Sequence, residues 1–207
     1  MAWFKRTMAY ITKSTHIQFM DDFYQINNNS DLGVYSKDLK KMLDQLEAML
    51  SYHNKLMMIR FDLHLKRHSK DNTLISKYFN RLNSSILKRF KLKRYAYVWC
   101  REHNKSLSQH YHVALLVDGN KYQSPHYVLE FCKAKWEALG QHFSYCWSEH
   151  RVVNRQHVNI VRGNWSDYQE VIYWLSYLAK SNTKTNRLST TNKYSTSRLK
   201  RKVDANK

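Results

Sequence analysis

The chain has 207 residues, of which 35 are Lys or Arg and 16 are Asp or Glu, so its formal net charge at pH 7 is +19. A surplus of this size attracts polyanions, either nucleic acid or an anionic membrane surface. Only four Gly and one Pro are present, which argues against a Gly-rich phosphate loop and Pro-rich linkers, and no apolar run is long enough for a spanning helix or a signal peptide. We therefore expect a cytoplasmic protein that binds nucleic acid and has no membrane partner.

The first part of the chain predicts an extension, a helix, a strand and a second helix. Residues 1–35 mix aromatic and polar side chains, and their pattern assigns no role to them. From Ser36, apolar residues recur at helical spacing behind a Ser cap, which predicts a helix over about 36–53. The period then changes to two, and residues 57–65 are predicted to form a strand with one polar face. Helical spacing returns over 72–90.

The second part of the chain alternates strands and helices. The predicted elements are a strand at 94–102, a strand at 109–118, a helix from Ser124 and Pro125 to about Leu139, one or two strands within 143–162, and a helix capped by Ser166 or Asp167 that extends to Lys180. A short polar stretch joins the first two strands and predicts a β-hairpin. The order predicts an α+β domain over residues 36–182: a central antiparallel sheet of four to five strands, of the split-βαβ kind seen in RRM and polymerase palm domains, covered by helices.

The composition changes after residue 182 to Ser, Thr, Asn and basic residues. The segment 181–207 holds eight Lys or Arg and one acid, a net charge of +7. Because it has almost nothing to bury, we expect residues 183–207 to be disordered until they contact an anion. The side chains predicted to contact DNA phosphates are Lys184, Arg187, Arg198, Lys200, Arg201 and Lys202.

Two histidines enter the strand at 109–118 with one residue between them. His110 and His112 lie on the same face, because successive side chains of a strand alternate. A hairpin that pairs residue 102 with residue 110 adds Glu102 to this face, and the same register matches apolar residues on the other face. Two imidazoles and one carboxylate suit Mg²⁺ or Mn²⁺ acting as a Lewis acid on a phosphodiester. The alternative for Glu102 is a salt bridge with a neighbouring basic residue.

The last predicted helix carries two tyrosines and a lysine on one face. Tyr173 and Tyr177 are four residues apart, and Lys180 follows three residues later. On a helical wheel the three residues face away from the apolar stripe, which disfavours a packing role, although an exposed tyrosine pair without function is the alternative. A phenol that attacks a phosphodiester needs its pKa of about 10 lowered, and the Lys180 ammonium is placed to do so. This spacing arises by chance about 0.1 times in a chain of this composition.

Together these motifs resemble the HUH endonucleases, specifically the two-tyrosine initiators of rolling-circle replication. The segments 99–102, 110–115 and 173–180 look most like the filamentous-phage (inovirus) replication proteins and their prophage relatives of the YagK/YfjJ type. The resemblance covers residues 56–198, whereas residues 1–35 match no family that we can name. Because the resemblance reaches Arg198, it implies an alternative in which part of the tail folds over the site.

The resemblance implies a metal-dependent endonuclease and ligase that nicks one DNA strand and starts rolling-circle replication. In this interpretation one tyrosine forms a 5′-phosphotyrosine, and the second tyrosine, or the same one again, resolves the product. Tyr177 is favoured over Tyr173 as the first nucleophile because it is closer in sequence to Lys180, which stabilises phenolate or pentavalent charge. The two histidines and the glutamate hold Mg²⁺ or Mn²⁺. The expected partners are single-stranded or supercoiled origin DNA and a host helicase, in the cytoplasm of a bacterial host of the phage or prophage.

Two other functions stay open on the sequence alone. The first is a basic nucleic-acid-binding protein without catalysis, in which Tyr95, Tyr97 and Trp99 are stacking platforms on an RRM-like sheet. The second is a two-tyrosine transposase, which would share the site and differ in the DNA that it recognises. The strand at 57–65 matches the first motif of the family, and the resemblance implies that it lies beside the histidine strand. It lacks the Thr often found near the end of that motif, so no catalytic role is assigned to it.

Overall fold

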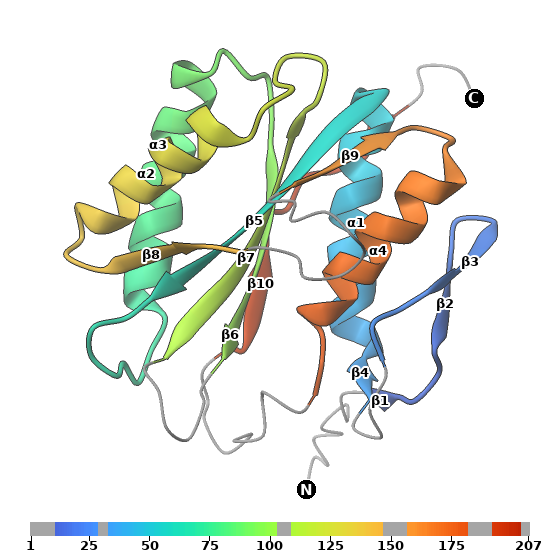
Figure 1. Ribbon diagram of the computed structural model, residues 1–207, viewed down its shortest axis with the longest axis horizontal. Helices are drawn as coiled ribbons and strands as arrows, with labels where there is room; N and C mark the ends of the chain where they lie inside the picture. The colour runs from blue at the N-terminus through green and yellow to red at the C-terminus, as the bar shows by residue number, and fades with distance from the viewer. Residues whose placement is uncertain (1–10, 29–32, 103–108, 147–156, 182–191, 204–207) are drawn as a thin grey trace, which may run out of the picture.

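The computed structural model is built around a large antiparallel β-sheet with helices on both faces (Figure 1). It describes residues 11–28, 33–102, 109–146, 157–181 and 192–203. In these residues the strands of the large sheet are, in spatial order, β10 (Tyr194–Thr196), β6 (Ala96–Glu102), β7 (His110–Asp118), β5 (Lys55–His64) and β8 (His142–Tyr145), with β9 (His157–Val161) beside the other half of β5. The predicted α+β class with a central antiparallel sheet is confirmed, with six strands instead of four or five.

The helices form two layers, one on each face of the sheet (Figure 1). Helices α2 (Thr73–Arg89) and α3 (His126–Glu137) pack on one face, and α1 (Ser36–Tyr52) and α4 (Trp165–Tyr177) pack on the other. Strands β5 and β7 are therefore covered on both sides, which explains the continuous apolar runs at 56–59 and 113–117. None of the helices in the described part of the chain is long and apolar enough to cross a membrane.

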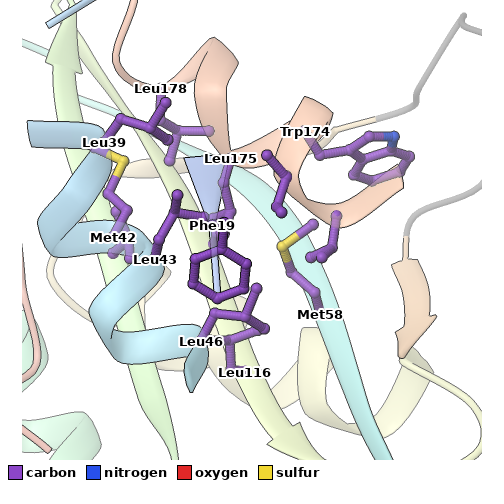
Figure 2. Close-up of a cluster of buried hydrophobic side chains, with 14 of the residues drawn as sticks. Phe19, Leu39, Met42, Leu43, Leu46, Met58, Leu116, Trp174, Leu175 and Leu178 are labelled. Atoms are coloured by element: carbon purple, nitrogen blue, oxygen red, sulfur yellow. The ribbon is translucent and has the colours of Figure 1, made fainter. Parts of the chain in front are cut away.

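The core between the sheet and helices α1 and α4 unites distant parts of the chain (Figure 2). Phe19 lies among Leu39 and Met42 of α1, Leu116 of β7 and Leu175 of α4, and each of these side chains is buried. A second core, on the other face, is formed by apolar residues of β5, β6 and β7 with those of α2 and α3. Each face of the sheet thus has its own hydrophobic core.

The N-terminal segment belongs to this fold, although its sequence assigned no role to it. It forms β1 (Ile11–Thr12), which pairs with β4 (Val34–Tyr35), and a hairpin of β2 (His16–Phe19) and β3 (Asp22–Gln25). The hairpin packs on α4: Gln25 and Gln169 exchange two hydrogen bonds of 2.9 Å, and the Ser176 hydroxyl accepts a 2.8 Å bond from the Asn27 backbone N–H. The segment therefore supports the helix that carries the tyrosines.

The predicted register of the β6–β7 hairpin is confirmed. Glu102 lies opposite His110, and Trp99 lies opposite Val113 on the other face. On its second edge β7 pairs with β5, which places Asp62 opposite His112. The family resemblance implied that these two strands are neighbours, and the pairing confirms it, whereas the residue pattern alone did not give the register.

Three predicted helix ends are wrong. Asn164, not Ser166 or Asp167, caps the last helix, because its side-chain oxygen accepts hydrogen bonds from the two following backbone N–H groups of Ser166 and Asp167. The helix ends at Tyr177, three residues before Lys180. Ser36 is the first residue of α1 and not its cap.

The expected disorder of residues 183–207 is wrong for the described residues 192–203. Residues 194–196 form β10 at the edge of the sheet, and the Ser197 hydroxyl donates a 2.7 Å hydrogen bond to the Gln45 side chain of α1. Composition alone did not reveal these partners, because they lie far away along the chain. Lys184 and Arg187 lie outside the described residues.

The aromatic side chains of β6 do not form an open stacking platform. Tyr95 and Trp99 are buried, and Tyr97 stacks on Phe79 of α2 with ring centroids 3.9 Å apart. Because α2 covers this face, the RRM-like alternative loses the exposed rings on which it depended.

Candidate metal centre

Three predicted metal ligands converge at one end of strands β6 and β7. Suitable ligand atoms of Glu102, His110 and His112 all lie within 4.8 Å of one another. The Nε2 atoms of the two histidines are 3.2 Å apart, and His110 Nε2 is 3.5 Å from Glu102 Oε2, which also contacts His112 Nε2. The donor set of two imidazoles and one carboxylate, all aimed at one point, fits a divalent cation.

A second carboxylate orients one of these ligands. Asp62 of β5 accepts a 2.7 Å hydrogen bond from His112 Nδ1, which leaves Nε2 directed at Glu102 and His110. A carboxylate behind a histidine is the usual arrangement in protein metal sites, because it fixes the ring and makes the ligating nitrogen more basic. Its presence is a further reason to interpret the cluster as a metal centre.

The ionisable side chains of this cluster strongly shift one another's pKa in the metal-free protein. Burial alone would lower the pKa of His112, but hydrogen bonds with Asp62 and Glu102 outweigh burial and raise that pKa to about 10. Burial alone would raise the pKa of Glu102, but the two histidines hold it at about 2. The pKa of Asp62 is also lowered, since its bond with His112 outweighs its burial. A cation that binds here replaces a proton on His112.

Tyr177 lies directly beside this cluster. Its ring packs edge to face against the ring of His112, with centroids 5.5 Å apart. It is half-buried at the last residue of α4, and two cations lie near its ring: the Arg60 guanidinium carbon at 5.0 Å from the centroid and Lys180 Nζ at 5.2 Å. Tyr177 thus combines a position at the metal centre with neighbouring positive charge.

The expected lowering of the Tyr177 pKa by Lys180 is wrong for the metal-free protein. Burial raises the pKa of the Tyr177 phenol, the Glu102 carboxylate raises it further, and Arg60 opposes both effects. Burial also lowers the pKa of Lys180. Arg60, not Lys180, is therefore the cation that favours the phenolate most in this arrangement.

The N-terminal segment places Lys180 near Tyr177. Val34 forms a β-bridge with Lys180, and the backbone N–H of Ser181 donates a 3.0 Å hydrogen bond to the carbonyl of Gly33. Gly33 has φ +77°, and a Cβ there would lie 2.5 Å from the Ile11 side chain. A glycine is needed at this position for both reasons, so the support of Lys180 depends on a residue far from the site in sequence.

The remaining predicted site residues lie farther from the metal centre. Tyr173 is half-buried one turn earlier on α4 and packs against the apolar core. In the tail, Arg198 and Lys200 are exposed, Arg201 forms an ion pair with Glu47, and the backbone of Lys202 donates a hydrogen bond to Ser51. Residues 197–202 therefore run along α1, and part of their charge is used within the fold.

Three polar residues of β5 were missed as site residues. Arg60, Asp62 and His64 share one face of the strand, and His64 stacks on His110 with ring centroids 5.2 Å apart. Their alternation with apolar residues was visible in the sequence, and the strand matched the first motif of the resembling family. The resemblance also implied that this strand lies beside the histidine strand, and the pairing of β5 with β7 brings this face to the histidines. The polar residues were passed over because the Thr of the family motif is absent.

The fold and the site define an α+β protein with a histidine–carboxylate centre beside a tyrosine. The family model of the YagK/YfjJ C-terminal domain matches residues 15–193, and the chain belongs to this family. The match begins well before residue 56, in the N-terminal segment for which the sequence had suggested no family. No curated protein and no solved structure gave a significant match.

Proposed function

We propose that this protein is a metal-dependent, site-specific DNA nicking and strand-transfer enzyme that initiates rolling-circle replication. The observation that carries the proposal is the contact between Tyr177 and His112, which joins a nucleophile to a set of metal ligands. A purely structural histidine cluster would not need a tyrosine at this position, and a purely packing tyrosine would not need two cations over its ring.

The metal would be held by Glu102, His110 and His112, and it would supply Lewis-acid stabilisation of the scissile phosphate. Asp62 keeps His112 in the orientation that such binding requires. We propose Mg²⁺ or Mn²⁺ as the cation, because a carboxylate and water suit both ions and phosphodiester chemistry commonly uses them.

In the proposed reaction the Tyr177 phenol loses its proton to water, and its Oη forms a bond to phosphorus. The bond from phosphorus to the 3′ oxygen breaks, and that oxygen takes up a proton to give the free 3′-hydroxyl that primes synthesis. One phosphodiester replaces another, so no external energy source is needed, and the 5′-phosphotyrosine can later be attacked by a 3′-hydroxyl. Tyr173 would serve as the second nucleophile, and Lys180 would stabilise the developing negative charge.

The proposed substrate is single-stranded or supercoiled origin DNA in a bacterial host cytoplasm, with a phage or prophage as the source, and the proposed partner is a host helicase. The net charge of +19 favours a polyanionic substrate. Of the predicted phosphate contacts, Arg198 and Lys200 are exposed. Arg201 and Lys202 are also at the surface, and Lys184 and Arg187 lie outside the described residues. For all six residues the phosphate contact is part of the proposal.

The test is covalent capture of DNA. The protein is incubated with Mn²⁺ and a labelled library of single-stranded oligonucleotides, and protein–DNA adducts are isolated under denaturing conditions and mapped by mass spectrometry. We expect an adduct on Tyr177, with its loss or transfer to Tyr173 in the Tyr177→Phe variant, and no adduct when a chelator is present. Tyr168→Phe is the matched control, because this buried tyrosine of the same helix lies in the core.

An adduct on a residue other than Tyr173 or Tyr177, or undiminished cutting in chelator, would contradict the proposal. The products separate replication from transposition. An initiator rejoins the ends of its own cleaved strand to give a circle, whereas a transposase joins a cleaved end to a different target molecule.

A further inference from the structure

Arg60 is a buried guanidinium without the hydrogen bonds that such a group needs. It lies on β5, opposite Ala114 of β7 and two residues from Asp62, and only 8% of its surface is exposed. Its Nε is buried without a hydrogen-bond partner, and Arg60 forms no ion pair with an acid in the described residues. Burying a charge in this way costs several kcal/mol unless another group compensates.

The groups around Arg60 offset the cost of burying its charge only in part. Its guanidinium carbon lies 5.0 Å from the centroid of the Tyr177 ring and 5.9 Å from that of Trp174, which gives two cation–π contacts. The nearest acid along the strand, Asp62, is already bonded to His112. Arg60 therefore lies beside Tyr177, and its Nε–H makes no hydrogen bond to the described residues.

A second buried arginine shows what a structural role looks like in this fold. Arg101 is also 8% exposed, but it lies on β6 and faces the opposite core. It donates hydrogen bonds to the carbonyls of Ser69 and Asp71 and to the Asn72 side chain. Among the described residues, by contrast, no acceptor pairs with the Arg60 guanidinium.

We propose that Arg60 binds the scissile phosphate at the reaction centre, beside the cation that Glu102, His110 and His112 would hold. This inference rests on the proposed function and adds to it a phosphate-binding residue on a strand that had no assigned role. A guanidinium offers paired N–H donors that match two phosphate oxygens. Beside Tyr177 it would stabilise the charge that develops on those oxygens during attack and would hold the phosphotyrosine product.

The direct test is phosphate binding by the full chain, followed by NMR after labelling of its arginines with ¹⁵N. The Nε–Hε signal of Arg60 is assigned by its loss in Arg60→Met, and inorganic phosphate is then titrated against chloride at equal ionic strength. We expect the Arg60 signal to move in a saturable way with phosphate and the Arg101 signal to stay in place. A response of Arg60 to phosphate no greater than its response to chloride would overturn the inference.

The second arm measures nicking on the DNA found by covalent capture. Under single-turnover conditions we expect Arg60→Met to be at least about 100-fold slower, Arg60→Lys to recover part of the rate, and Mn²⁺ affinity to change less than threefold in both. The Arg101→Met control should lose stability, because it removes three hydrogen bonds that the guanidinium donates within the fold, whereas Arg60→Met should be as stable as the wild type.

The two arms separate the inference from the proposed function. If the wild type captures no DNA but its Arg60 signal saturates with phosphate, the phosphate site stands and the nicking function is refuted. If the wild type nicks DNA and Arg60→Met, still folded by its NMR spectrum, nicks at the same rate, the nicking function stands and the role of Arg60 is refuted.

Discussion

The two faces of the large sheet are made by the same strands but serve different purposes. Toward α2 and α3, β5 presents only apolar side chains, from Met57 to Leu63. Toward α1 and α4, the same strand has the buried Leu56 and Met58, followed by Arg60, Asp62 and His64. One face is thus apolar from Met57 to Leu63, whereas the other changes midway from apolar core residues to the polar residues of the site.

This difference shows how the fold can carry a polar cluster at its centre. A buried group of charges stabilises a protein little and can destabilise it, because each charge loses its hydration. The uninterrupted core under α2 and α3 supplies stability that the polar half of the other face does not. The comparison makes distinct predictions for substitutions on the two faces.

The largest effect is expected for His112→Ala on the site face. Nicking should fall at least about 1,000-fold, on the order of 4 kcal/mol in barrier height, because the ligand set loses its central imidazole. Single-turnover adduct formation and calorimetric Mn²⁺ titration measure the two losses, while DNA affinity should stay nearly unchanged. Full nicking activity of His112→Ala would show that the polar face of the sheet is not needed for catalysis.

The opposite pattern, lost stability with metal binding retained, is expected for Leu115→Ala. Leu115 lies on the apolar face of β7, the strand that also carries His112. The free energy of unfolding should fall by about 2–5 kcal/mol, because the fully buried side chain leaves a cavity. Urea denaturation measures this loss, and Mn²⁺ affinity of the folded variant should match the wild type. A loss of Mn²⁺ binding without loss of stability would show that the two faces are not separable.

A smaller effect is expected for Asp62→Asn, which removes the charge behind His112 but keeps the side-chain shape. Mn²⁺ affinity should weaken about 10- to 100-fold, as found when a supporting group behind a metal ligand is changed. Calorimetry measures the change, and Asn159→Asp, an added carboxylate at an exposed position of β9, is a control for general charge effects. Unchanged affinity in Asp62→Asn would mean that His112 needs no orientation.

The smallest effect concerns pH. Because the pKa of His112 is raised to about 10, the metal-free site is protonated at neutral pH, whereas an ordinary histidine is already neutral. Mn²⁺ affinity should therefore rise about tenfold per pH unit between pH 7 and 8.5, with release of about one proton. Calorimetry in buffers of different ionisation enthalpy counts that proton.

The raised pKa of His112 gives the stability of the metal-free protein the opposite pH trend: stability falls, rather than rises, with increasing pH. A raised histidine pKa contributes stability that is fully present below the ordinary value near 6.5 and is lost as the pH rises toward about 10. Denaturation with and without Mn²⁺ should show the two trends diverging. A Mn²⁺ affinity that does not depend on pH would contradict the proton-linked site.

The part of the site that the sequence predicted depends on local pairing. The hairpin of β6 and β7 could be aligned because a slip by one residue would exchange its apolar and polar faces, and only one register keeps Glu102 beside His110. The tyrosine and lysine spacing was likewise readable within one segment, although the helix ends at Tyr177.

The parts that the residue pattern alone could not predict depend on distant partners. Asp62 and Arg60 reach the site because β5 pairs with β7 across an intervening helix and strand; the family resemblance implied this pairing, but alternation in β5 does not reveal its neighbour. In the described tail residues 192–203, Ser197 bonds to Gln45, 152 residues away, while composition alone indicated disorder.

The sheet order also sets when a newly made chain becomes a complete enzyme under the proposed function. β5, the first strand of the large sheet to be synthesised, is an inner strand, and β10, the last, lies at its edge. Asp62, Glu102 and both histidines precede Tyr177 in the chain and are therefore made before it. A growing chain would thus acquire its metal ligands before its nucleophile, and it could not cut DNA until α4 had packed onto the sheet.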